Sequence, residues 1–85
     1  MCTMIAQQVK VNGSGKSTMG WNRIDQASVS YDHPYDMPVE YSLNLDFTNE
    51  EGARVAVELD AASARRLVET IQEVIHRAEA GGYIE

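Results

Sequence analysis

The clearest pattern in the chain is a strict alternation of apolar and polar residues in its middle. Apolar residues stand at every second position over residues 39–47, and the pattern returns over residues 53–59. Side chains of a β-strand point to opposite faces in turn, so both runs predict strands with one buried face. The polar connection between them ends in Gly52, which favours an antiparallel hairpin.

The segment that follows has the periodicity of an amphipathic helix. Asp60 is a good N-cap residue, because its carboxylate can accept hydrogen bonds from the first free N–H groups. Gly81 and Gly82 are typical of a helix end. Between these caps, apolar residues recur three or four positions apart and share one face. They are Ala64, Leu67, Val68, Ile71, Val74, Ile75 and Ala78.

The first half of the chain is less regular but predicts two further strands. Residues 5–11 and 23–31 carry apolar residues at alternating positions, although Gln7 interrupts the first run. The glycine- and serine-rich segment 12–20 predicts a flexible connector. Two prolines interrupt the pattern in the segment 31–38.

These elements predict an α+β fold in the order β-β-β-β-α. Consecutive strands with short connections favour a four-stranded antiparallel meander, with the C-terminal helix packed on one face. A chain of 85 residues has the size of one domain, so we expect a single domain over residues 1–85.

The apolar face of such a sheet is wider than the helix that should cover it. Four strands span about 19 Å, whereas a helix is about 10–12 Å across. The single cysteine excludes an internal disulfide that could stabilise a small core. Uncovered apolar surface usually marks an interface, so we expect a homodimer or a higher homo-oligomer. The alternative is a coiled sheet that wraps its own helix, with Trp21 and Met37 closing the gap.

The charge of the chain limits its partners. Thirteen acidic residues against seven basic ones give a formal net charge of −6. This acidic balance argues against binding to nucleic acid or to an anionic membrane surface, since both need a basic surface. No apolar stretch approaches the roughly 20 residues that cross a bilayer, and no signal-peptide pattern opens the chain. We therefore expect a cytoplasmic protein.

The glycine-rich segment that contains Lys16 looks at first like a phosphate-binding P-loop. The required first glycine is replaced by Lys10, and Gly20 follows too soon for the helix that such a loop needs. Nucleotide hydrolysis is therefore not predicted. The Gly13–Lys16 loop is interpreted as a mobile hairpin loop whose N–H groups can still contact an anion.

The segment 31–38 is the richest in chemistry. It combines an imidazole with carboxylates and phenols, in the residues Asp32, His33, Tyr35 and Asp36. His33 with Asp32 or Asp36 can act as an acid–base pair or bind a divalent metal. The alternative is a turn in which an aspartate accepts backbone N–H groups and the tyrosines pack on the sheet.

Cys2 directly follows the initiator methionine. Removal of Met1 would leave a terminal cysteine whose amine can serve as a base for its own thiol, or which chelates a metal. The alternative is a small apolar side chain at the start of a strand.

Several short motifs together give the chain a family resemblance. They are the start MCTMIA, the GSGK loop before Gly20-Trp21, YDHP over residues 31–34, NLDF over 44–47 and RVAVEL over 54–59. Together they resemble a family of small uncharacterised bacterial proteins, mainly actinobacterial, over nearly the full length. This resemblance implies no activity. It does suggest that Cys2, the glycine loop and the Asp-His-Pro turn belong together.

The resulting hypothesis is a non-enzymatic homo-oligomeric binding or accessory module without a cofactor. It would contact a small ligand or a partner protein through the Asp32-His33-Pro34 loop and the Gly13–Lys16 loop. The contact residues would be Asp32, His33, Tyr35, Asp36, Cys2 and Lys16. The alternative is a small enzyme or metalloprotein with a site built from His33, Asp32, Asp36 and Cys2, assembled across a dimer interface.

Overall fold

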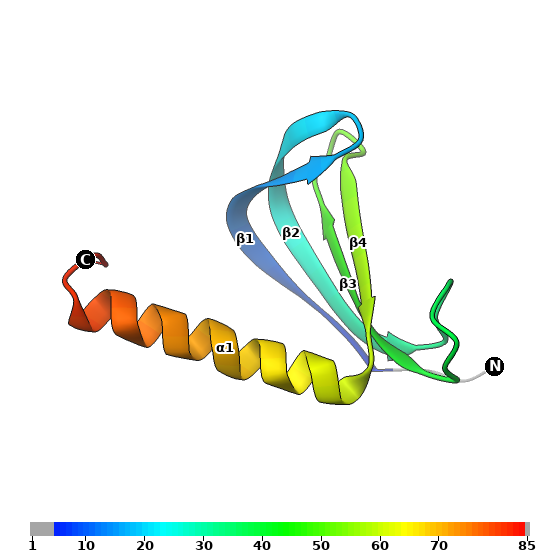
Figure 1. Ribbon diagram of the computed structural model, residues 1–85. Coiled ribbons are helices and arrows are strands. Elements are labelled where there is room, and N and C mark those ends of the chain that lie inside the picture. The colour runs from blue at the N-terminus through cyan, green and yellow to red at the C-terminus, as the bar shows by residue number, and fades with distance from the viewer. Residues whose placement is uncertain (1–4, 85) are drawn as a thin grey trace.

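A computed structural model describes residues 5–84 and confirms the predicted α+β fold (Figure 1). Four antiparallel strands lie in the sequence order β1-β2-β3-β4, followed by one helix. The elements are β1 (Ile5–Ser17), β2 (Gly20–Asp32), β3 (Ser42–Thr48), β4 (Arg54–Leu59) and α1 (Ala61–Ala80). Among the described residues, no helix combines the length and the apolar character that a membrane span requires.

The first hairpin is longer than the sequence pattern predicts. The segment 12–20, expected as a flexible connector, is mostly strand, and β1 continues to Ser17 opposite Gly20. Glycine and serine weaken a strand without forbidding extended backbone, so pairing with β2 overrides their preference. Gly20 has a φ of 100°, which favours glycine at this turn.

The third strand is shorter than predicted. β3 begins at Ser42, whereas the alternation suggested a start at Val39. Pro38 lacks the N–H that a strand ladder needs. The N–H of Val39 donates to the carbonyl of Met37, 2.9 Å away, which turns the chain before the strand begins. Residues 39–41 therefore belong to the loop that joins β2 to β3.

The strand register gathers the apolar residues on one face of the sheet. Three cross-strand rows form this face: Ile5–Tyr31–Leu43–Leu59, Gln7–Val29–Leu45–Val57 and Val9–Ala27–Phe47–Val55. The opposite face carries polar rows such as Ser30–Asn44–Glu58. The alternation predicted this division of β3 and β4 correctly.

A bulge in β1 makes the sheet coil. Lys10 pairs with Gln26 and Gly13 with Ile24, so two residues of β1 oppose one residue of β2. An extra residue of this kind bends its strand and increases the twist. The bend brings Gly15 over Val55, where an added Cβ would lie 3.0 Å from Val55 Cγ2. One end of the sheet therefore closes on itself.

The core enclosed in this way is small. Among the described residues, the buried apolar side chains are Ile24, Ala27 and Ala64. The hydroxyl of Ser42, also buried, donates to Asn44 Oδ1 at 2.6 Å. Most of the apolar face towards the other end of the sheet stays accessible to solvent.

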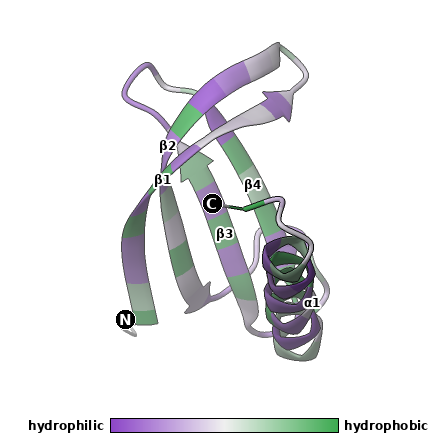
Figure 2. Ribbon diagram, turned by 90° about the vertical axis from the view of Figure 1, so that its left-hand side faces the viewer, coloured by the Kyte–Doolittle hydropathy of each residue, from purple (hydrophilic) through white to green (hydrophobic). Residues whose placement is uncertain are grey.

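The helix has the predicted caps but leaves the sheet after its first turn. The Asp60 carboxylate accepts from the Ser63 N–H at 2.7 Å, and this hydrogen bond holds its pKa below the ordinary value. The N–H of Gly81 donates to the carbonyl of Arg77 at 2.9 Å. Ala64 is buried, yet the apolar face beyond it is exposed. Figures 1 and 2 show α1 projecting away from the sheet from the end of β4.

We predict that Gly15→Ala destabilises the protein by about 1 kcal/mol or more, because the added methyl displaces the Val55 and Ile24 side chains. Urea unfolding measures the change. The control is Gly13→Ala, whose Cβ meets nothing within 4 Å, and which should be neutral or slightly stabilising. Equal midpoints for the two variants would contradict the close approach.

Candidate functional site

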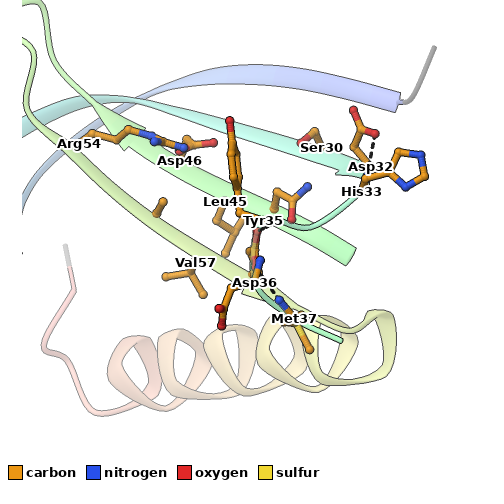
Figure 3. A pocket seen from close by; sticks show the side chains of 13 residues that line it. Ser30, Asp32, His33, Tyr35, Asp36, Met37, Leu45, Asp46, Arg54 and Val57 are labelled. Atoms are coloured by element: carbon orange, nitrogen blue, oxygen red, sulfur yellow. Dashed lines mark hydrogen bonds and ion pairs between the residues drawn. The ribbon is translucent and has the colours of Figure 1, made fainter. Parts of the chain in front are cut away.

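The loop over residues 33–41 crosses the polar face of the sheet and forms a groove with it (Figure 3). The groove has a volume of about 570 Å³. Its lining includes His33, Tyr35, Asp36 and Met37 from the loop and Ser30, Asn44, Asp46, Arg54 and Glu58 from the strands. The loop contains most of the segment 31–38, the richest in chemistry, and the fold places it over polar residues of the sheet.

Glu58 of β4 fixes the loop in this position. Its carboxylate accepts the backbone N–H of Tyr35, and those of Asp36 at 3.1 Å and Met37 at 3.2 Å. The Tyr35 N–H, followed by the other two, lowers the pKa of Glu58 below its ordinary value. In the sequence, Glu58 is one of the polar residues between the apolar positions of the run 53–59, and nothing singles it out. Its hydrogen-bond donors lie more than twenty positions away in the chain, so no local sequence pattern predicts these contacts.

His33 is held by its own set of contacts. Nδ1 lies 3.0 Å from the Glu40 carbonyl, which can only accept, so Nδ1 carries the proton. The imidazole stacks on Tyr41 with the ring centroids 4.8 Å apart. The backbone N–H of His33 donates to Asp32 Oδ1 at 2.7 Å. This is the turn geometry that the sequence offered as the alternative to a catalytic pair, and it leaves Nε2 as the ring atom for a ligand.

An ion pair lies towards the other end of the groove. Arg54 Nε is 2.6 Å from Asp46 Oδ1, and the pKa of Arg54 rises chiefly through this hydrogen bond. Four carboxylates line the groove against this one guanidinium: Asp32, Asp36, Asp46 and Glu58. The groove is therefore acidic.

Tyr35 is the most accessible aromatic residue of the groove. The residue is 95% exposed, although its backbone N–H is bound to Glu58. In Figure 3 the Tyr35 ring stands between the Asp46–Arg54 pair and the Asp32–His33 end of the groove. The loop thus combines a fixed backbone with a phenol that is available for contact.

The structure does not bring all the proposed contact residues together. Lys16 pairs with Trp21 at one end of the first hairpin, whereas Asp32 pairs with Ser42 at the other end of β2. Eleven residue steps along β2 separate Trp21 from Asp32, which correspond to roughly 35 Å along the strand. One small ligand cannot contact both ends. Cys2 lies outside the described residues.

The possible metal ligands do not form a cluster. Over residues 5–84, no three His, Cys, Asp or Glu side chains come close enough together to hold a metal ion. His33, Asp32 and Asp36 line the same groove, but two of them take part in the turn described above.

Replacing Glu58 by Gln should loosen the loop, because an amide NH₂ cannot accept and only one oxygen remains. We predict several-fold faster hydrogen exchange at the Tyr35, Asp36 and Met37 amides, with little change in β3. Hydrogen-exchange mass spectrometry measures this. Glu50→Gln is the matched control in the β3–β4 turn. Unchanged exchange in the loop would show that Glu58 does not hold it.

The same hydrogen bonds predict a pH dependence. Because folding lowers the pKa of Glu58, the ionised carboxylate stabilises the folded state. This contribution to stability is fully present above the pKa that Glu58 has in the unfolded chain. That contribution disappears as the pH falls through the lowered pKa of the folded state. The NMR signals of the Tyr35, Asp36 and Met37 amides should therefore stay constant near neutral pH and shift together in acid. Shifts at a pH above the ordinary glutamate range would contradict the assignment.

Known proteins place the chain in a family but supply no activity. No curated protein and no solved structure matches it. The family model that matches covers residues 1–84, nearly the whole sequence. This agrees with the resemblance carried by the short motifs. The chain belongs to DUF6295, a family of unknown function.

Proposed function

We propose that this chain is a non-enzymatic binding module that works as a homo-oligomer and takes a small ligand in the groove under the 33–41 loop. The observation that carries the proposal is the set of three backbone N–H groups held by Glu58. It fixes the loop backbone before any ligand arrives, and a preformed site loses less entropy on binding. The side chains of Tyr35 and Asp36 remain available for contact.

The charges of the groove favour a ligand that bears a positive group. Arg54 is already paired with Asp46, and the Glu58 oxygens already accept backbone N–H groups. Asp36 is then the carboxylate best placed to meet a cation at the groove. The exposed Tyr35 ring adds a π face on which an ammonium group can rest. We therefore propose a small organic cation as the ligand.

A catalytic role for His33 has less support from the geometry. The acid–base pair that the sequence suggested needs a carboxylate on the ring, but Nδ1 is bound to the Glu40 carbonyl, which orients the imidazole without adding a charge. Asp32 accepts from the backbone and not from the ring. These contacts favour binding over proton transfer.

NMR titration of the full chain tests the proposal with choline, putrescine and arginine methyl ester, against citrate and glucose. The cations should shift Tyr35, Asp36 and neighbouring groove residues, and salt should weaken the effect. We predict that Asp36→Asn and Tyr35→Ala each weaken binding about two- to fivefold. Glu51→Gln, which removes the same charge at the β3–β4 turn, should not.

Two outcomes would contradict this function. One is the absence of groove shifts with every cation. The other is an equal response to citrate, which would show that the carboxylates do not select the ligand.

A further inference from the structure

Two apolar surfaces of this chain remain without a partner. The first, the helix stripe, consists of Leu67, Val68, Ile71, Val74 and Ile75, with exposed fractions between 41% and 59%. The second, the sheet patch, consists of Ile5, Val9, Tyr31 and Val57, exposed by 72%, 56%, 37% and 39%. Beside the patch lies a mainly apolar hollow of about 340 Å³, lined among others by Ile5, Val29 and Leu43.

The exposed area is too large for a compact chain of this size. The protein exposes 6,900 Å², whereas a compact protein of 9.4 kDa exposes about 5,000 Å². Its radius of gyration is 14.7 Å, against about 12 Å expected for a compact domain of 85 residues. The excess of about 1,900 Å² per chain is what an obligate homodimer buries on each subunit.

The helix is held away from its own sheet by a short connection. Only Asp60 separates β4 from α1, and its backbone is extended, with φ −71° and ψ 162°. Its carboxylate binds the first turn through the Ser63 N–H. The backbone of the N-cap residue Asp60 thus sets the direction of the helix. Ala64 reaches the sheet, and the stripe beyond it does not.

A second copy of the same chain fits both surfaces. From Ala64 to Ala78 the apolar side of the helix measures about 21 Å, and a four-stranded sheet is about 19 Å wide. Neither surface contains a charged side chain, so bringing them together desolvates no charge. A two-fold axis lets each chain give its helix and receive one, and no copy is left with an open surface.

We propose that two copies exchange helices, with the helix stripe of each packed on the sheet patch of the other. This inference rests on the homo-oligomeric part of the proposed function and not on its ligand. The exchange covers the apolar face on one side of the sheet and leaves the groove on the other side accessible.

Analytical ultracentrifugation at micromolar concentration gives the first test. The wild-type chain should sediment at twice 9.4 kDa. Ile71→Glu should weaken dimerisation by at least about a hundredfold, because it places a charge within the apolar contact. Gln72→Glu adds the same charge on the polar side of α1 and should leave the dimer intact.

A paramagnetic label at position 72 distinguishes helix exchange from other modes of dimerisation. It leaves the residues of the helix stripe unsubstituted. The double variant Cys2→Ser/Gln72→Cys, made without ¹⁵N, carries a nitroxide at position 72. It is mixed with wild-type chains that contain ¹⁵N and no nitroxide. Only contacts between chains can then broaden the ¹⁵N signals. Exchange predicts broadening around Ile5, Val9 and Tyr31 of the sheet.

Each result has a distinct meaning. A 9.4 kDa species at micromolar concentration would overturn both the exchange and the homo-oligomer. A dimer whose broadening is confined to α1 would show helix-to-helix association and overturn the exchange alone. Neither result bears on ligand binding, because the titration of the groove is read independently.

Discussion

Backbone pairing along β2 is the interaction on which the rest of this structure depends. β2 pairs with β1 on one side from Gly20 to Tyr31 and with β3 on the other from Gln26 to Asp32. Each hydrogen bond of such a ladder contributes about 1 kcal/mol net. With so few apolar side chains buried, this ladder rather than a packed interior keeps the sheet together. A chain held in this way has much to gain from added apolar burial.

The two faces of the sheet differ in character, and β4 contributes residues to both. Glu58 points to the polar face and fixes the loop, while its neighbour Val57 belongs to the apolar face. Packing on the apolar face would restrain the strand that positions Glu58. The proposed dimer contact and the proposed ligand groove therefore lie on opposite faces of one short strand.

Local patterns predicted most of the fold, and contacts between distant residues explain what they missed. Alternation and the cap at Asp60 were sufficient for β4, for α1 and for β3 from Ser42 onwards, but they placed the start of β3 three residues too early. The extension of β1 through Gly15 depends on pairing with β2 and on the bulge, which composition does not encode. The segment of the candidate site was identified by its residue types. The role of Glu58 was not, because it arises only when the loop folds back onto β4.

The bulge in β1 also determines where this fold can change in length. Beyond the extra residue, Gly15 faces Val55, a place where a Cβ is already crowded. Removing one residue of β1 before Gly15, with the pairing of the preceding residues kept, would bring Lys16 to that place. The number of residues between Lys10 and Gly15 is thus part of the architecture.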